Sequence, residues 1–221
     1  MAMTSLINPK KYQIVQPSAP LKILNAHGWM RSKESYSAID AEGNPIPWMT
    51  YPAIEYLNQL DLSQHRVLEW GSGNSSRYFA AKSKEVISIE HNKEWYDSLK
   101  STLAPNQKIC YTELNQYAAF PLELGVKFDL IVVDGMLRKE CVEQAYQLTS
   151  EGALILLDNS ERYPDICSEI RRHGYFQVDF HGFGPINDYT WTTSIFISAS
   201  SIGKFQPLTI QPSRPIGGEN N

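Results

Sequence analysis

Hydrophobic and polar residues follow two different periods along this chain, which indicates strands separated by helices. From residue 66 onward, short apolar runs with the length of buried strands alternate with segments of helical spacing. Such an alternation is typical of a parallel sheet that helices cover on both faces. The predicted strands are Arg66–Trp70, Val86–Glu90, Lys108–Glu113, Phe128–Val133 and Ala153–Leu157, and the predicted helices are Ser75–Ala81, Lys93–Leu103, Lys139–Gln147 and Pro164–His173.

The pattern changes after residue 173. Tyr175–Phe180 and Thr192–Ala199 have the composition of strands, and the loop between them leaves no room for a crossover helix, so they should pair antiparallel. The expected fold class is therefore α/β. It is a Rossmann-like, doubly wound sheet of seven strands in three layers, mostly parallel and closed by an antiparallel hairpin.

The chain divides into three predicted parts. Residues 1–52 form an N-terminal extension and covering segment, in which 1–20 should lack regular structure because prolines interrupt them. Residues 53–200 form the α/β domain, and a helix over Ala53–Leu60 opens it directly after a proline. Residues 201–221 read as a tail.

Composition narrows the range of partners. The 221 residues carry a net charge of −4, so nothing in the charge attracts nucleic acid or an anionic membrane. Three widely spaced cysteines suggest buried free thiols rather than disulfides or a zinc site, and no apolar stretch has the length of a signal peptide or membrane span. We therefore expect a cytoplasmic protein that acts on a small molecule, and the sequence leaves open whether it forms a homodimer.

The first strand, the turn after it and the end of the second strand form a unit suited to nucleoside binding. Gly71 and Gly73 allow the backbone to turn tightly and to approach a ligand. Glu90 ends the next strand about twenty residues on, where a carboxylate can accept the ribose hydroxyls. His91 is a candidate contact to the adenosine, although a histidine at such a place is more often a surface residue than a ligand.

Two details separate the possible nucleosides. A nicotinamide-binding turn usually has a third glycine, where this chain has Ser76. Glu69 lies two residues before Gly71, and its negative charge would repel a pyrophosphate but favour the sulfonium of S-adenosylmethionine. These residues favour the sulfonium cofactor.

The chain resembles the class I S-adenosylmethionine-dependent methyltransferases over about Leu60–Ile197, and most closely bacterial methyltransferase-like proteins of uncertain substrate. The resemblance rests on Glu69-Trp70-Gly71-Ser72-Gly73, Glu90, Val132-Val133-Asp134-Gly135 and Leu157-Asp158-Asn159. It implies that the cofactor contacts are Glu69, Gly71, Ser72, Gly73, Glu90, His91 and Asp134.

Three side chains at the ends of neighbouring predicted strands suggest a metal site. Asp134, Asp158 and Asn159 offer the oxygen ligands that Mg²⁺ prefers, at the place where catechol-type O-methyltransferases hold a divalent ion. Those enzymes carry a basic residue three positions after the fourth-strand acid, where this chain has Leu137. Asp134 could instead contact cofactor or substrate without a metal, or cap the next helix. Arg138 and Lys139 could clamp an anionic substrate, or be solvated.

The expected substrate side is formed by the loop 181–191 and by part of the N-terminal segment. The loop is rich in aromatic and polar residues and suits a substrate lid. His181 is a candidate general base because its ordinary pKa lies near neutrality, and a turn residue without a catalytic role is the alternative. Trp48, Thr50 and Tyr51 could close the pocket or could simply pack.

These observations predict transfer of a methyl group from S-adenosylmethionine to an oxygen of a small molecule or a sugar-containing metabolite, with Asp134 and His181 as candidate catalytic residues. Mg²⁺ is a possible second cofactor. Two alternatives stay open: a nicotinamide-dependent oxidoreductase, and a non-catalytic binding or scaffold protein with the same fold.

Overall fold

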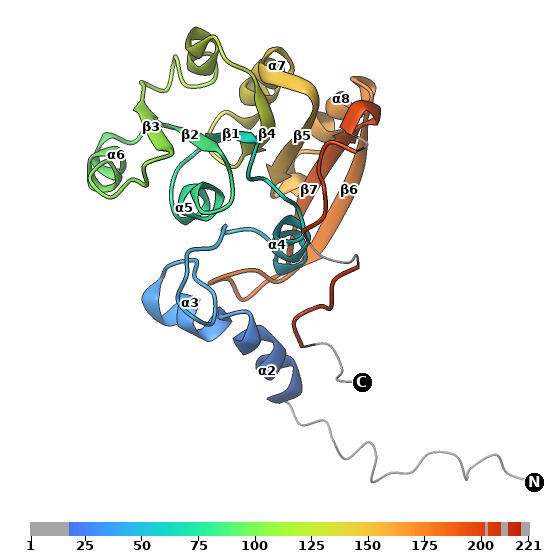
Figure 1. Ribbon diagram of the computed structural model, residues 1–221. Coiled ribbons are helices and arrows are strands. Elements are labelled where there is room, and N and C mark those ends of the chain that lie inside the picture. The colour runs from blue at the N-terminus through green and yellow to red at the C-terminus, as the bar shows by residue number, and fades with distance from the viewer. Residues whose placement is uncertain (1–17, 202, 209–211, 218–221) are drawn as a thin grey trace, which may run out of the picture.

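A seven-stranded mixed sheet forms the centre of the molecule (Figure 1). The computed structural model describes residues 18–201, 203–208 and 212–217. The strand order is β3-β2-β1-β4-β5-β7-β6, in which β1 to β5 are parallel and β7 pairs antiparallel with both β5 and β6. The strands are β1 Arg66–Trp70, β2 Glu85–Glu90, β3 Gln107–Tyr111, β4 Phe128–Val133, β5 Thr149–Asp158, β6 Tyr175–Gly182 and β7 Trp191–Ser198.

Helices cover both faces of this sheet. The helices that follow the predicted pattern are α4 Tyr51–Asn58, α5 Asn74–Ala80, α6 Lys93–Leu99, α7 Arg138–Leu148 and α8 Pro164–Arg172. The residues of α4 and α5 pack with Leu130 and Val132 of β4, whereas those of α7 and α8 pack with Ile131 and Val133 of the same strand. Successive residues of a strand point to opposite faces, so the continuous apolar run of β4 serves two cores. The predicted fold class is confirmed.

The N-terminal segment is more regular than the sequence predicts. Two helices, α2 Ser18–Ala26 and α3 Trp29–Ser35, precede α4, although no regular structure was expected at Ser18–Pro20 and the region from Trp29 reads as aperiodic. Gly28 separates them in a left-handed conformation (φ 89°), and a Cβ there would lie 2.3 Å from the backbone of Asp40. The expectation for residues 1–17 lies outside the described residues.

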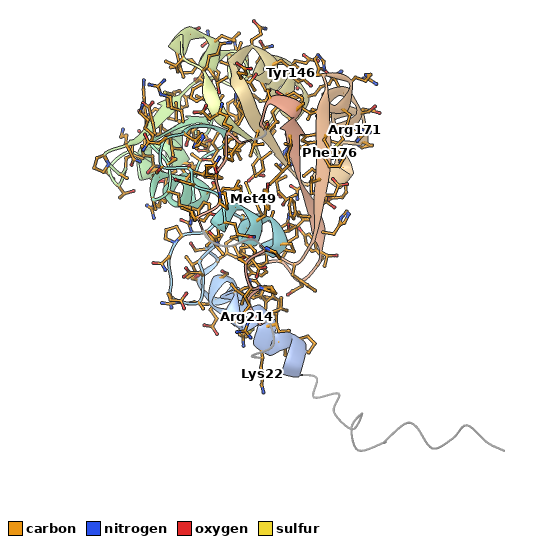
Figure 2. All side chains as sticks on the ribbon, turned by 45° about the vertical axis from the view of Figure 1, so that its right-hand side comes forward. Lys22, Met49, Tyr146, Arg171, Phe176 and Arg214 are labelled. Atoms are coloured by element: carbon orange, nitrogen blue, oxygen red, sulfur yellow. The ribbon has the colours of Figure 1, made fainter. Side chains whose placement is uncertain are left out.

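The N-terminal segment is joined firmly to the sheet. Met49, labelled in Figure 2, is fully buried, and the Thr50 amide donates to Thr193 Oγ1 on β7 at 3.1 Å. The amide of Tyr51 donates to the carbonyl oxygen of Phe183 at 2.7 Å. Among the described residues, none of the helices has the length and apolar character needed to cross a membrane.

Candidate functional site

The turn from β1 into α5 begins the candidate site. Gly71 has φ 102°, a conformation that favours glycine, and a Cβ there would lie 3.5 Å from Gly135 in the turn after β4. Ser76 occupies the place of the third glycine and donates from its hydroxyl to Glu69 while accepting from the amide of Gly73 at 3.1 Å. The serine thereby ties the start of α5 to the strand before it.

Glu90 lies at the end of β2, beside this turn. Its carboxylate is buried and accepts hydrogen bonds from Ser72 Oγ and from the amide of Asn92, both at 2.7 Å. His91 Nδ1 lies 3.4 Å from the same carboxylate. Each carboxylate oxygen has a second lone pair, so Glu90 is held in place and retains accepting capacity.

A cavity of about 370 Å³ opens between these strand ends. Its lining residues are Glu69, Gly71, Ser72, Ser75, Glu90, His91, Tyr117, Asp134, Gly135, Met136 and Arg138. The buried Tyr117 hydroxyl has no hydrogen-bond partner among the described residues, and a Cβ on Gly135 would lie 2.0 Å from it. An unpaired polar group and an acid beside a glycine turn fit a nucleoside with ribose hydroxyls.

Two further cavities adjoin the first and share Asp134 with it. One, of about 230 Å³, is lined by Tyr36, Ser37, Ala38, Trp48, Ser72, Gly73, Asn74, Ser75, Trp95, Asp134 and Ile186. The other, of about 300 Å³, is lined by Trp48, Asp134, Asp158, Asn159, Arg162, Asn187, Tyr189 and Trp191. Asp134 therefore lies at the junction of all three spaces, with its side chain one quarter exposed.

Arg138 occupies the position at which the sequence suggests a metal ion. Its Nη2 donates to Asp134 Oδ1 at 3.0 Å and to Asn159 Oδ1 at 3.2 Å, and its Nη1 donates to the carbonyl oxygen of Asp158. The side chain is only 10% exposed. A guanidinium thus neutralises the oxygens that would have to coordinate Mg²⁺.

The carboxylate of Asp158, the third suggested ligand, is also engaged. Its Oδ1 accepts from Thr193 Oγ1 at 2.5 Å and from Trp191 Nε1 at 3.1 Å. Within the described part of the chain, no group of three His, Cys, Asp or Glu side chains is placed to hold a metal ion. The metal hypothesis is therefore not supported: the donor set does not fit Mg²⁺, because the cation it surrounds is Arg138.

Burial raises the pKa of three carboxyl groups at the site, those of Glu69, Asp134 and Asp158. Burial raises the pKa of Glu69 to about 7, although hydrogen bonds from neighbouring serines lower it in part. The pKa of Asp134 is raised by burial, while Arg138 lowers it and Glu69 raises it. Burial and then the charge of Asp134 raise the pKa of Asp158. The full negative charge expected at Glu69 is consequently reduced near neutral pH.

Some predicted site residues lie elsewhere. His181 belongs to β6, where its Nδ1 lies 2.7 Å from Thr192 Oγ1. It lines a separate cavity of about 190 Å³, which has no lining residue in common with the three cavities around Asp134. Thr50 and Tyr51 are buried in packing, and of the three N-terminal candidates Trp48 alone lines the site cavities. The structure does not place His181 where a base for this site would act.

Several other residues at the site have no role that the sequence assigns. Tyr117 follows β3 in an irregular segment, and Trp95 on α6 donates from Nε1 to the carbonyl oxygen of Ser72 at 2.8 Å. Asn74 Nδ2 donates to Ser37 Oγ and to the carbonyl oxygen of Ala38, both at 2.8 Å, which attaches the N-terminal segment to α5. These contacts join residues more than twenty positions apart in the chain, so no local sequence pattern predicts them.

Local backbone strain gathers around the site. The non-glycine residues with positive φ in the described part of the chain are Tyr36, Leu137, Asn159 and Ile186, at 49° to 70°. Tyr36, Asn159 and Ile186 line the site cavities, and Leu137 directly precedes Arg138. Residues in such conformations cluster at functional sites, where the surrounding structure holds them.

No protein-family model matches this sequence, and no curated protein does. Among solved structures, a protein from Staphylococcus aureus described as a caffeoyl-CoA O-methyltransferase aligns with a TM-score of 0.54 and 18% identity, over 86% of this chain and 99% of that one. An rRNA methylase from Streptococcus thermophilus aligns with a TM-score of 0.51 and 10% identity, over 66% of this chain and 96% of that one.

Other similar structures are proteins of different described functions. The fibrillarin pre-rRNA processing protein of Methanococcus jannaschii aligns with a TM-score of 0.52 and 14% identity, over 66% of this chain and 74% of that one. Spermidine synthase from Thermotoga maritima aligns with a TM-score of 0.49 and 15% identity, over 71% of this chain, which spans 59% of that one. At these identities the likeness establishes the fold alone. This chain has the class I S-adenosylmethionine-dependent methyltransferase fold.

Proposed function

We propose that this protein transfers the methyl group of S-adenosylmethionine to a hydroxyl oxygen of a small molecule. The observation that supports it is the position of Asp134. One carboxylate lies between a cavity with nucleoside-binding features and a second cavity open to a substrate. The nucleoside side contains Glu90 for the ribose hydroxyls and the glycine turn for the remaining part of the cofactor.

The composition of the 300 Å³ cavity supports a hydroxyl-rich acceptor. Trp48, Tyr189 and Trp191 provide flat aromatic surfaces, and the amide and carboxyl groups beside them provide donors and acceptors. Asp158 Oδ2 and Asn159 Nδ2 have no hydrogen-bond partner among the described residues. Aromatic surfaces next to planar polar groups suit a sugar ring or a similar polyol. Arg162, the cation that lines this cavity, is paired with Glu161 at 3.4 Å, so an anionic acceptor gains less there.

In this proposal Asp134 removes the proton of the acceptor hydroxyl. The bound cofactor supplies an electrophilic methyl group on a sulfonium sulfur. With the cofactor bound, the acceptor oxygen would take the methyl carbon as the carbon–sulfur bond breaks, and the hydroxyl proton would pass to Asp134 Oδ2. Burial raises the pKa of Asp134, which makes its carboxylate a stronger base, and Arg138 holds the other oxygen in place. The walls of the two cavities would orient the cofactor and the acceptor toward each other.

Binding of the product cofactor tests the nucleoside side. We expect S-adenosylhomocysteine to bind in calorimetric titration, and Glu90→Gln to weaken it about tenfold through loss of a charged acceptor for the ribose. Glu94→Gln, in the exposed first turn of α6, is the matched control and should bind as the unchanged protein does. Binding of NADH with none of S-adenosylhomocysteine would instead indicate an oxidoreductase.

Turnover tests the transfer step. Release of S-adenosylhomocysteine is measured with a panel of hydroxylated acceptors, with and without EDTA. We expect turnover that is indifferent to the chelator, because Arg138 occupies the position of a metal. Asp134→Asn should lower the rate by about a hundredfold or more while binding of S-adenosylhomocysteine changes little. Tight cofactor binding without turnover on any acceptor would favour a scaffold protein.

A further inference from the structure

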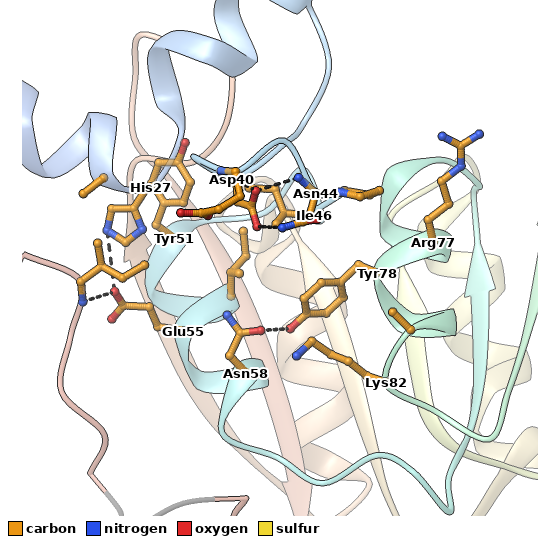
Figure 3. Close-up of a pocket in the computed structure, with 16 residues that line it drawn as sticks. His27, Asp40, Asn44, Ile46, Tyr51, Glu55, Asn58, Arg77, Tyr78 and Lys82 are labelled. Carbon is orange, nitrogen blue, oxygen red and sulfur yellow. Dashed lines mark hydrogen bonds and ion pairs between the residues drawn. The ribbon is translucent and has the colours of Figure 1, made fainter. Parts of the chain in front are cut away.

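A cavity of about 410 Å³ lies apart from Asp134, between α4, α5 and the loop 40–46 (Figure 3). The end of α2 and Ile216 of the C-terminal segment complete its walls. None of its lining residues lines the three spaces around Asp134. Its size is that of a small-molecule pocket.

The walls of this distal cavity are held by their own contacts. The carboxylate of Asp40 accepts from the amide of Glu42 at 3.0 Å and from the amide of Asn44 at 2.7 Å, which fixes the loop. The ring of His27 stacks on Tyr51 with 4.3 Å between the centroids. The space is therefore preformed.

Two nitrogen donors at one end of the cavity lack acceptors among the described residues. Lys82 Nζ lies 5.1 Å from the centroid of the Tyr78 ring, and in the described part of the chain no carboxylate lies within ion-pair distance of it. Burial lowers the pKa of Lys82. Asn58 Oδ1 accepts from the Tyr78 hydroxyl at 2.8 Å, which leaves Asn58 Nδ2 as a donor with no acceptor among the same residues. Figure 3 shows Asn58 and Lys82 at the same end of the cavity.

The remaining walls limit what these donors can bind. Ile46, Ile54 and the ring of Tyr78 provide apolar surface. The carboxylates of Asp40, Glu42 and Glu55 also line the cavity, and its second cation, Arg77, donates to Thr102 Oγ1 at 2.9 Å. A doubly charged phosphate on Lys82 would therefore meet more repulsion from these carboxylates than a singly charged group does. A single carboxylate matches one ammonium and one amide.

We propose that this cavity is a second ligand site, which binds a small monocarboxylate with its charged end on Lys82 and Asn58 and its apolar body against Ile46 and Ile54. The site is separate from the proposed site of methyl transfer, because none of its lining residues lines the spaces around Asp134.

Phenylacetate and its neutral counterpart phenylacetamide are the probes for this site. In ligand-observed NMR titrations we expect phenylacetate to bind saturably, with a dissociation constant of about 1 mM or tighter, and phenylacetamide to bind at least about tenfold more weakly. In protein-observed spectra of the same titration, amide resonances of residues 44, 46, 58, 78 and 82 should shift, and those of Gly71 and Gly135 should not. No methyl donor is present, so the outcome is separate from that of the proposed function.

Two lysine variants locate the charge. Lys82→Met keeps the length of the side chain and should weaken phenylacetate binding at least about tenfold, with an unchanged melting temperature. Lys84→Met, an exposed lysine two residues on, is the matched control and should leave binding unchanged. The proposal is overturned if phenylacetate does not bind saturably, if phenylacetamide binds equally well, or if Lys82→Met binds phenylacetate as the unchanged protein does.

Discussion

Among single residues, Arg138 carries a positive charge into a group of oxygens that the sequence suggests as metal ligands. It donates to side chains or carbonyl oxygens of Asp134, Asp158 and Asn159, and it is nearly buried. The spacing of acids at strand ends can be read from the sequence. The cation that these acids surround depends on the conformation of the turn that carries Leu137 and Arg138. The pattern of hydrophobic and polar residues does not predict that conformation.

Removing this guanidinium should destabilise the protein. Arg138→Met leaves the Asp134 carboxylate and four carbonyl oxygens without this donor, so the free energy of unfolding should fall by about 3 kcal/mol in urea titrations. Lys139→Met removes a charge from the adjacent, exposed position and should change it by less than about 0.5 kcal/mol. Equal effects of the two substitutions would mean that Arg138 is not held as described.

Glu69 should make stability depend on pH. Its pKa is raised from 4.5 to about 7 in the folded protein. The folded state therefore binds this proton more tightly than the unfolded state, and the stability that this group contributes is complete below about pH 4.5 and is lost as the pH rises through about 7. The raised pKa corresponds to roughly 3 kcal/mol.

The substitution Glu69→Gln tests this dependence, since it keeps the shape and removes the titration. The difference in unfolding free energy between the variant and the unchanged protein should shift by roughly 3 kcal/mol in favour of the variant between pH 4.5 and 8. Chemical denaturation at several pH values measures it. Parallel pH profiles for the two proteins would contradict a raised pKa at Glu69.

Among the elements, helix α3 and the loop 183–190 form one unit across the chain. Trp29 Nε1 donates to the carbonyl oxygen of Asn187 at 2.9 Å, and Lys33 pairs with Asp188. The sequence indicates a covering segment and a lid separately, as aromatic-rich regions. Their attachment to each other spans more than 150 residues, and only the folded chain brings them together.

Trp29→Phe tests this attachment, because it keeps an aromatic ring and removes the donor. Loss of one hydrogen bond should raise hydrogen exchange of the amides in residues 183–190 about fivefold, corresponding to about 1 kcal/mol. Amides of β4 in the centre of the sheet serve as the internal control and should exchange at an unchanged rate. Unchanged exchange in the loop would show that α3 does not restrain it.

At the scale of the whole molecule, the antiparallel hairpin closes the sheet and completes its core. Phe196 on β7 is fully buried and packs with the helices of one face, whereas Phe176 on β6, labelled in Figure 2, is 71% exposed. Phe176 pairs with Ile197, the residue after Phe196 on β7. The two phenylalanines therefore lie close together in the hairpin but differ in burial.

Truncating these two phenylalanines should therefore have different consequences. Phe196→Ala should lower the free energy of unfolding by about 3–5 kcal/mol, because it removes a ring from the core and leaves a cavity. Phe176→Ala should lower it by less than about 1 kcal/mol. Thermal and urea unfolding measure both. Similar losses would indicate that β6 is covered in solution, as it would be in a homodimer.

The amino-acid sequence by itself determined the α/β class, the parallel strands, the closing hairpin and the row of candidate residues at Gly71, Glu90 and Asp134. These follow from local periodicity and from the short, ordered connections of such sheets, which bring the carboxyl ends of parallel strands to one edge. Helices α2 and α3 were not predicted, because the spacing of their own apolar residues is a weak helix signal. Contacts with distant parts of the chain stabilise them.

The tertiary structure alone decided which of these residues act together. It placed Arg138 rather than a metal among Asp134 and Asn159, and it separated His181 from Asp134. It also created the distal cavity, whose walls come from five separate parts of the chain. Local sequence fixes the direction and the face of an element, but contacts across long stretches of chain arise from packing of the whole molecule, and burial then sets the charges of the groups that meet there.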